Sequence, residues 1–394
     1  MRYFAGIDVA KTVHWICVID ANAEVLLDRA VTNAQEDMDR LVGELRPFAP
    51  DLTICLDVMG SIATFVEAAL IEAGFRVVHV PGIAVNRARD GFANREAKSD
   101  PKDARVIADY ARTRPTLRPV EHDDETTIAI RLMIGRRRNL VEEQTRRIAR
   151  LRRYLGSIHP ELEIALDING LGSAHLLTRY VTPTEIRRAG PKRILAHLQR
   201  LPHLHKREEM AHKVFEVAQR QHTIVPGEAT FASLVRELAE EIILTREKLA
   251  RLDKGLETLL ARHPDAALIR TLPGMGAILT ASFIAAAGSI ARFKSAGAIA
   301  ATAGLAPVMR QSGYSRVFRR TYGGDKDLKR VFFQSAFCAY AKGDPVCRAF
   351  YNRKRREGKR HTQAIIALAR RRVNVLWTML KSRQPCDPER AITS

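Results

Sequence analysis

The sequence predicts an α/β domain with a mixed sheet at the N-terminus, then a long helical and partly coiled-coil spacer, then an all-α C-terminal domain. Three short runs rich in β-branched and aromatic residues come first, separated by polar turns. Helix-like and strand-like runs then alternate, and helical periodicity dominates the remainder. We therefore expect domains at residues 1–125, 126–262 and 263–394.

The elements of the first domain follow from their residue patterns. In chain order we expect strands at 3–9, 13–19 and 24–31, a helix near 34–46, a strand at 52–58, a helix at 61–73 and a strand at 76–80. The resulting order, βββαβαβα, is that of the ribonuclease H-like fold. In that fold the first and fourth strands are neighbours, so acids on these strands would meet at one edge of a site.

Composition indicates a nucleic-acid partner. The chain has 394 residues, with 64 Lys and Arg against 44 Asp and Glu, and a formal charge of +20. Clustered cations bind phosphate with counterion release whatever the base sequence, and a membrane surface is the rival partner for such a charge. Hydrophobic residues make up 46%, enough for two or three buried cores.

Targeting and cysteine signals are weak. No apolar run reaches the roughly 18 residues that span a bilayer, and Met1 to Gly6 leads into a strand rather than a secretion signal. We therefore expect a cytoplasmic, nucleoid-associated protein. The five cysteines lack the spacing of a zinc site or a disulfide framework, so we interpret them as reduced and structural.

Two acids stand on strands that are expected to be neighbours. Asp8 lies between Ile7 and Val9, and Asp57 ends an apolar run. Burying such a carboxylate costs several kcal/mol unless something pairs with it, and Mg²⁺ or Mn²⁺ would suit its oxygen ligands. Either residue alone is better explained as a strand-end turn residue that caps nearby backbone, but the pair on neighbouring strands favours metal binding.

Two further acids, Asp100 and Asp103, come just ahead of the helical run from Val106 to Arg112. They suit the start of a helix, where an acid in the first turn favours the dipole and Ser99 or Asp100 would cap the N-terminus. Positions three apart also share a helix face, so both carboxylates could reach one metal ion. The residues alone leave both interpretations open.

Basic residues concentrate on one long helical pattern from Thr126 to Tyr154. Because few acids balance them, we expect a helix that faces nucleic acid, with oligomer packing through its apolar residues as a compatible second role. The candidate contacts there are Arg136, Arg137, Arg138, Arg146, Arg147 and Arg150. A second long helix, from Ala229 to Arg262, has apolar spacing that suits either an antiparallel coiled-coil hairpin or a dimer contact.

The C-terminal region has three further places where nucleic acid could be contacted. Gly274 and Gly276 lie in a turn of helix-hairpin-helix type, where backbone amides can approach a phosphate, although the turn also fits a simple packing corner. Cations surround a Gln311-Ser312-Gly313 motif, and others accompany Phe350 and Tyr351, whose rings would stack on bases. These cations are Arg310, Arg316, Arg319, Arg320, Arg353, Arg355 and Arg356.

Ser312 is a candidate nucleophile. A serine hydroxyl needs help from a base or a metal at neutral pH, and nearby cations could stabilise the charge that develops on an attacked phosphate. A plain turn serine is the alternative, and Ser315 is a nearby competitor.

Five motifs together resemble a known family. They are Gly6-Ile7-Asp8-Val9-Ala10-Lys11, Asp57 with Gly60, Ser99-Asp100-Pro101-Lys102-Asp103-Ala104, Ala303-Gly304-Leu305-Ala306-Pro307 and Gln311-Ser312-Gly313. They resemble the DEDD transposases of the insertion sequence 110 family, which combine a RuvC-like domain with a serine transposase domain. The matches lie at both ends of the chain.

The resemblance implies metal-assisted cleavage and exchange of donor and target DNA. Asp8, Asp100 and Asp103 would be three of four metal-binding acids, and Ser312 would be the nucleophile. The family's second acid is usually glutamate, whereas this chain has Asp57, which is shorter by one methylene. The family's basic-Gly element after the serine is also altered here. The resemblance further implies a structured guide RNA and a dimer or tetramer.

Two rival functions remain. One is a RuvC-like metal-dependent nuclease, such as a junction resolvase, that uses water in place of Ser312. The other is a catalytically weakened DNA-binding relic, disabled by the change at Asp57.

Overall fold

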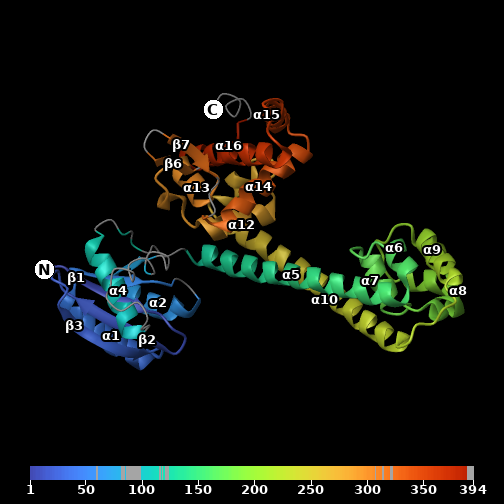
Figure 1. Cartoon of the computed structure of the whole chain (residues 1–394), viewed down its shortest axis with the longest axis horizontal. Coiled ribbons are helices and arrows are strands. Elements are labelled where there is room, and N and C mark those ends of the chain that lie inside the picture. Colours follow the sequence, from blue (N-terminus) through green and yellow to red (C-terminus); the bar gives the residue numbers. More distant parts are fainter. Residues whose placement is uncertain are drawn as a thin grey trace. The chain divides into compact units, whose positions relative to one another are not determined.

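The chain divides into two compact units, Met1–His122 and Asp123–Ser394, both drawn in Figure 1. The computed structural model describes residues 1–58, 61–80, 85, 99–114, 117, 119, 124–306, 308–312, 315–319 and 323–387. Each unit is described below by itself.

The first unit is built on a five-stranded mixed sheet. Its strands are β1 (Tyr3–Asp8), β2 (Val13–Ile19), β3 (Val25–Thr32), β4 (Leu52–Leu56) and β5 (Arg76–His79). They lie in the order β3-β2-β1-β4-β5, with β1 antiparallel to β2 and parallel to β4. The expected mixed sheet is therefore confirmed, and the first and fourth strands are neighbours, as the ribonuclease H-like order requires.

Helices cover both faces of this sheet. They are α1 (Gln35–Leu45), the short η1 (Arg46–Phe48) and η2 (Ser61–Ala63), α2 (Thr64–Glu72) and α4 (Asp100–Thr113). Successive side chains of a strand point to opposite faces. Ile7 and Leu56 accordingly join the core formed with α1 and α2, whereas Cys55 joins a core that contains Ile107 of α4. Helix α4 therefore covers the face opposite α1 and α2.

Two long helices organise the second unit. α5 (Glu125–Ile158) and α10 (Glu228–Arg262) pack side by side, as Figure 1 shows. The start of α5 shares a core with the end of α10, and the end of α5 shares another core with the start of α10. The two helices are therefore antiparallel, and α10 packs its apolar residues against α5 of the same chain.

A separate hydrophobic core lies at each end of this helix pair. The core that we call the distal core includes buried residues of α6 (Pro160–Ala165), α7 (Leu171–Leu177), α8 (Pro183–Leu198) and α9 (Arg207–Arg220). The C-terminal core includes buried residues of α11 (Ala266–Arg270), α12 (Ala277–Ala287), α13 (Ala296–Thr302), α14 (Lys326–Ala341), α15 (Pro345–Arg356) and α16 (His361–Ser382). A short η3 (Ile290–Arg292) joins α12 to α13.

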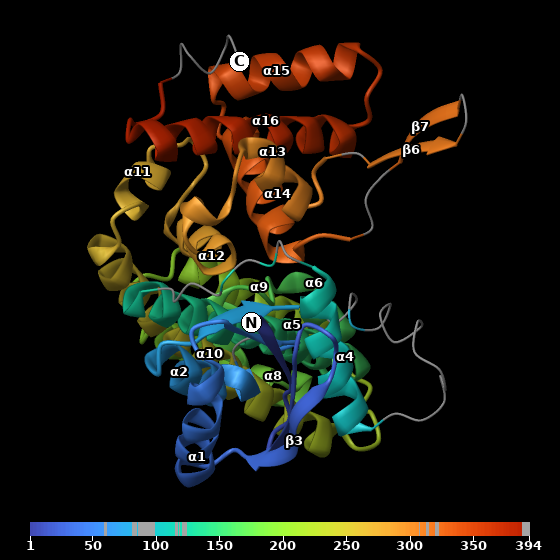
Figure 2. The same ribbon diagram turned by 90° about the vertical axis from the view of Figure 1, so that its left-hand side faces the viewer.

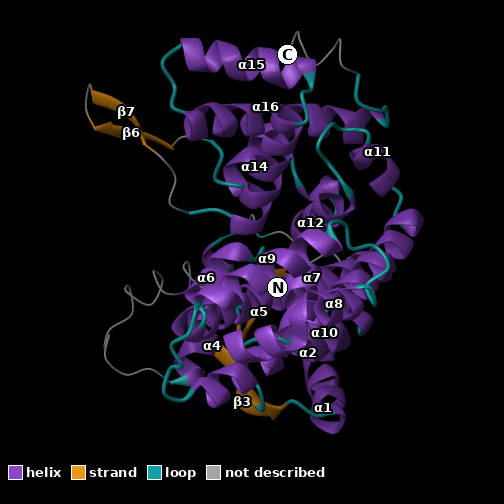
Figure 3. Ribbon diagram, turned by 90° about the vertical axis from the view of Figure 1, so that its right-hand side faces the viewer, coloured by secondary structure: helices purple, strands orange, loops and turns teal. Residues whose placement is uncertain are grey.

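The expectation of an all-α C-terminal domain is wrong in one place. β6 (Val308–Ser312) and β7 (Ser315–Arg319) form an antiparallel two-stranded ribbon, orange in Figure 3 among purple helices. Figure 2 shows the ribbon extending away from α13 and α14. The physical reason is visible in the sequence, because β-prone residues such as Val308, Val317 and Phe318 lie in these two segments.

The five cysteines are free thiols. Burial raises the pKa of the Cys17 thiol to about 11 and that of the Cys347 thiol to about 12. These groups are therefore protonated near neutral pH, which makes them poor nucleophiles and poor metal ligands.

Across the described part of the chain, no helix combines the length and apolarity needed to cross a membrane.

Candidate active site

The register between β1 and β4 places two acids at the same edge of the sheet. Gly6 pairs with Cys55 and Ile7 with Leu56 in a parallel ladder, so the next positions along are Asp8 and Asp57. Ile7 and Leu56 point into the core beneath α1 and α2. By alternation, Asp8 and Asp57 point to the opposite face, which is the face that α4 covers.

Gly6 lets α4 approach β1 closely enough to bring a third acid to this edge. A Cβ at Gly6 would lie 2.1 Å from the carbonyl oxygen of Ala104 and 2.4 Å from the amide nitrogen of Ala108. No larger residue fits such an approach without moving the helix. Asp103, in the first turn of α4, is consequently only 2% exposed.

Asp57 and Asp103 are close enough for their charges to interact. Burial raises the pKa of the Asp57 carboxyl above its ordinary value, the backbone amide of Val9 opposes that rise, and the charge of Asp103 adds to it. Oδ1 of Asp57 is buried and accepts no hydrogen bond from the described residues. His79 contacts the backbone carbonyl of Asp57 at 3.3 Å.

This donor set fits a hard divalent cation. Two carboxylates whose charges interact, one of them buried, repel, and an oxygen-preferring ion such as Mg²⁺ or Mn²⁺ would offset that cost. The buried Oδ1 of Asp57 supplies a ligand atom with no other hydrogen-bond partner in the described structure. The residues present at this edge therefore suit the metal that the sequence predicted.

Asp100 occupies a different environment. It is the first residue of α4, follows the N-cap Ser99 and is exposed, whereas Asp103 one turn later is buried. Among the described residues, no group of three or more His, Cys, Asp or Glu side chains is arranged closely enough to hold an ion. The fold thus brings Asp57 within range of the charge of Asp103, places Asp8 on the neighbouring strand at the same edge, and leaves Asp100 exposed at the start of α4.

Ser312 is the last residue of β6 and pairs with Ser315 at the start of β7. Arg310 lies on β6, and Arg316 and Arg319 lie on β7. Gly313 and Arg320, also singled out in the sequence, lie outside the described residues.

Half of the candidate cations on α5 form ion pairs within the chain. Their N···O distances are 2.7 Å for Arg137 with Asp253, 2.8 Å for Arg138 with Asp327, and 2.6 Å for Arg147 with Glu241. By contrast, Arg136, Arg146 and Arg150 are exposed and pair with no acid among the described residues. The partners stand 94 to 189 residues away in sequence, so the local charge pattern could not reveal them.

The turn between α11 and α12 is explained largely by packing. Gly274 has a φ of +82°, and a Cβ there would lie 2.6 Å from the carbonyl oxygen of Ser335 and 2.8 Å from the amide of Ala339 on α14. Gly276, the N-cap of α12, has open space around its Cβ position. A phosphate contact in this turn therefore stays a prediction, and Gly276 is the better placed of the two glycines.

Only one of the two aromatic residues on α15 is available for stacking. Tyr351 is buried, and its hydroxyl contacts Nδ1 of His361 at 2.7 Å, so the expectation that its ring faces nucleic acid is wrong. Phe350 is partly exposed, with Arg353 above its ring. Arg355 and Arg356 are exposed on the same helix.

Comparison with known proteins gives matches along nearly the whole chain. A transposase family model matches residues 5–160, and the Transposase IS116/IS110/IS902 family model matches residues 266–352. The insertion element IS900 uncharacterized 42 kDa protein of Mycobacterium paratuberculosis is 38% identical over 98% of this chain and 97% of its own length. The insertion element IS116 uncharacterized 44.8 kDa protein of Streptomyces clavuligerus is 36% identical over 100% and 98%.

Solved structures give a weaker likeness. T. thermophilus RuvC in complex with Holliday junction substrate is 20% identical, covering 30% of this chain and 100% of that chain with a TM-score of 0.25. At this score the strand order of the sheet, rather than the likeness, supports the fold assignment.

Proposed function

Since the chain belongs to the IS116/IS110/IS902 family of transposases, we propose that it cuts and rejoins DNA with Ser312 as nucleophile. In this proposal a divalent metal ion is held by Asp8, Asp57, Asp100 and Asp103. The observation that carries it is the proximity of Asp57, at the end of β4, to the buried Asp103 of α4, with Asp8 on the neighbouring strand.

The acids prepare the site for a phosphate. Bound Mg²⁺ or Mn²⁺ would polarise a scissile phosphodiester and neutralise charge on it. The chain itself supplies the partly buried carboxylates of Asp8 and Asp57 at one sheet edge and the buried carboxylate of Asp103 on α4. Asp100, exposed at the start of α4, would complete the set from the rim.

Ser312 would carry out the covalent step. Its Oγ attacks the phosphorus and forms a phosphoserine ester, while the bond from phosphorus to a sugar oxygen breaks and that oxygen takes up a proton. Attack by the hydroxyl of another strand then restores the serine and rejoins the DNA. The nearby arginines Arg310, Arg316, Arg319 and Arg320 would stabilise the negative charge of the transition state.

The remaining parts of the proposal concern organisation and partners. We assign residues 1–125 to metal binding, 126–262 to a helical spacer and 263–394 to the serine domain. The acids and the serine belong to different units, so the proposed reaction needs both units, supplied by one chain or by two subunits of a dimer or tetramer. A structured guide RNA, as the family resemblance implies, would share the cationic surfaces with donor and target DNA.

Trapping the covalent intermediate tests this proposal. The full-length protein is incubated with DNA carrying the ends of its own element and Mg²⁺, the reaction is stopped with denaturant, and the adduct is mapped by mass spectrometry. We expect the modified residue to be Ser312, Ser312→Ala to abolish the adduct, and the matched variant Ser315→Ala to retain it.

Two outcomes would overturn the serine mechanism. DNA cleavage that persists in Ser312→Ala without an adduct would indicate a metal-dependent nuclease that uses water. An adduct on Ser315 would move the nucleophile to the opposite strand of the ribbon.

A further inference from the structure

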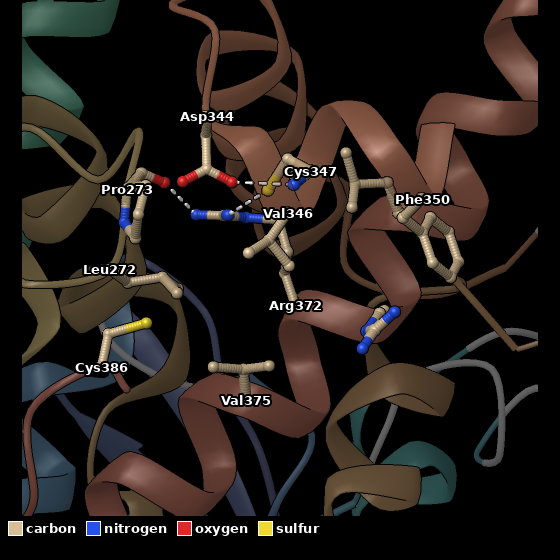
Figure 4. Close-up of a pocket in the computed structure, with 11 residues that line it drawn as sticks. Leu272, Pro273, Asp344, Val346, Cys347, Phe350, Arg372, Val375 and Cys386 are labelled. Carbon is tan, nitrogen blue, oxygen red and sulfur yellow. Dashed lines mark hydrogen bonds between the residues drawn. The ribbon is translucent and has the colours of Figure 1, made fainter. Parts of the chain in front are cut away.

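Buried polar side chains in the second unit can hold helices together. Arg372 is an example, since it is 3% exposed and donates to the carbonyl oxygen of Pro273 and to the sulfur of Cys347, as Figure 4 shows. The cavity beside it leaves about 40 Å³ for a ligand, which is room for a few water molecules. His14 on β2 is a buried polar side chain of a different kind, because it binds the turn that follows Asp8.

His14 lies on the face of the sheet opposite the acids. It is 1% exposed and pairs with Val31 of β3. Ile16, two residues further along β2, belongs to the core formed with α1 and α2, and alternation places His14 on that same face. Asp8 and Asp57 point to the other face, so His14 can act on them only through the intervening backbone.

Three hydrogen bonds hold the turn between β1 and β2. The amide of Ala10 donates to Nδ1 of His14 at 3.2 Å. Asn33, just after β3, donates from its side-chain amide to the carbonyl oxygen of Lys11 at 3.2 Å and from its backbone amide to that of Thr12 at 2.9 Å. Three successive residues of the turn are therefore held by groups on β2 and at the end of β3.

The bond from Ala10 fixes the chemical form of the His14 imidazole. Because Nδ1 accepts, the proton of the neutral ring is on Nε2. Nε2 and Oδ1 of Asn33 are both buried, with no hydrogen bond to any other described residue, and the two side chains interact. Burial lowers the pKa of His14 and the side chain of Asn33 offsets part of that effect, so the ring is neutral near neutral pH.

The same turn carries a backbone amide that contacts the carboxylate of Asp57. Val9 is the residue before Ala10, and the hydrogen bond from its amide lowers the pKa of Asp57 against the effect of burial. Oδ1 of Asp57 accepts no hydrogen bond from the described residues, so it stays available as a metal ligand. A movement of the turn would displace both the Val9 amide and Asp8, which precedes it in the chain.

We propose that His14 is a positioning residue for the metal site, because it holds the turn at Ala10 and thereby fixes Asp8 and the Val9 amide at the acid edge. The inference rests on the proposed function, since it concerns the ion that the acids would hold. A leucine could fill the space of His14, but it would not accept the hydrogen of the Ala10 amide. Removing a group that orients metal ligands from behind typically lowers metal affinity by about tenfold or more.

Manganese binding by the full-length protein tests this proposal. Free Mn²⁺ is measured by electron paramagnetic resonance, and the specific site is defined as the binding that Asp57→Asn removes. We expect His14→Leu to weaken this site by about tenfold or more, because the Ala10 amide loses its acceptor. His14→Asn should retain most of the affinity, because Oδ1 of asparagine is separated from the backbone by the same number of bonds as Nδ1 of histidine.

Two further variants separate positioning from packing. His14→Gln carries its amide group farther from the backbone, so it can meet Asn33 but offers no acceptor at the position of Nδ1. It should bind Mn²⁺ as weakly as His14→Leu does, and it serves if the leucine variant does not fold. Val18→Ala, at a fully buried position on the same strand and face, should lower the Tm in EDTA without changing Mn²⁺ affinity.

Hydrogen exchange of the metal-free protein gives a second measurement. The amides of residues 9–13 should exchange faster in His14→Leu and His14→Gln than in the wild type. They should exchange in His14→Asn as they do in the wild type, because the Ala10 amide keeps an acceptor there.

Two results would overturn this inference. One is wild-type Mn²⁺ affinity in both His14→Leu and His14→Gln. The other is a loss of affinity in Val18→Ala as large as that in His14→Leu, because metal binding would then follow stability alone. If either result appears while the wild type binds Mn²⁺ and forms the Ser312 adduct, only the positioning role fails. A wild type that binds no Mn²⁺ at Asp57 defeats the metal site of the proposed function, and this inference with it.

Discussion

The acid-bearing edge of the first unit and the serine-bearing ribbon of the second are held in place very differently. Asp57 and Asp103 meet because the sheet register, the alternation of side chains and the contact of Gly6 with α4 all require it. Ser312 stands at the end of a two-stranded ribbon, paired with Ser315. Changes at the acid edge should therefore alter folding and metal binding together, whereas changes at the serine should alter chemistry alone.

The largest effects are expected for one substitution at the acid-bearing edge and one on the serine-bearing ribbon. Asp57→Asn and Ser312→Ala should each lower strand transfer by about 10³-fold or more, because each removes a group on which the proposed step depends. Only Asp57→Asn should also abolish the rise in Tm that Mg²⁺ produces in the wild type. Activity assays and thermal melts with and without Mg²⁺ measure both quantities.

This comparison would be contradicted if adding Mg²⁺ did not change the Tm of the wild type or of either variant. That result would favour a weakened DNA-binding relic, in which the acids no longer bind metal. Loss of the Mg²⁺ response in Ser312→Ala would instead show that the ribbon takes part in metal binding.

A second prediction concerns the close contact that positions α4. Gly6→Ala should destabilise the first unit by about 1–3 kcal/mol, because the added methyl group would overlap the backbone of α4. Gly43→Ala on α1 is the matched control, since nothing lies within 4 Å of its Cβ position. Gly43→Ala should leave stability unchanged or raise it by up to about 1 kcal/mol. Urea denaturation of the full chain measures both, and equal stability of the two variants would contradict the predicted contact.

A third prediction is the pH dependence of the metal-free protein. The folded state holds the pKa of Asp57 above its ordinary value of 3.8, so the folded protein binds this proton more tightly than the unfolded chain. The stability from this residue is fully present below the ordinary pKa and is lost as pH rises through the folded pKa, with a slope of at most about 1.4 kcal/mol per pH unit.

Asp57→Asn should lack this slope. Denaturation in the presence of EDTA across the acidic range compares it with the wild type. If the wild type gained stability relative to the variant as pH rose, the Asp57 carboxylate would have a partner in the folded state that favours its charge.

The smallest effects are expected on α5, which belongs to the serine-bearing unit. Arg137→Gln should cost about 0.2–1 kcal/mol of stability, because it removes a partly exposed pair with Asp253, and should leave nucleic-acid affinity unchanged. Arg136→Gln should leave stability unchanged. It should reduce the slope of log DNA affinity against log salt concentration by roughly 0.9. Filter binding at several salt concentrations, together with urea melts, distinguishes the two, and equal salt slopes would contradict the assignment.

The sequence predicted the sheet well because its signals are local. Alternating apolar residues and short polar turns marked the strands, and their order placed β1 beside β4, which brought Asp8 and Asp57 to the same edge. The local sequence pattern did not predict that α4 packs closely against β1. Gly6 inside an apolar strand was the available clue, since such a glycine often marks the close approach of another backbone.

Other features depended on contacts between distant parts of the chain. The ion pairs of Arg137 and Arg138 form with Asp253 and Asp327, so a basic run that favoured nucleic acid proved partly structural. Burial of Tyr351 likewise depends on neighbouring helices. The β6–β7 ribbon is a different case, because the β-prone residues that form it are local and lie beside the serine motif.

The antiparallel pairing of α5 and α10 also bears on the order of events as the chain is synthesised. The polypeptide leaves one core along α5, completes the distal core, and returns along α10 before the C-terminal core can close. Once the distal core has formed, the beginning of α10 is already beside the end of α5, so the entropy of closing that long loop has been lost. We therefore expect the helices to zip from the distal core toward the C-terminal core, and nascent chains that end near Arg262 to be already protected from protease through residues 158–228.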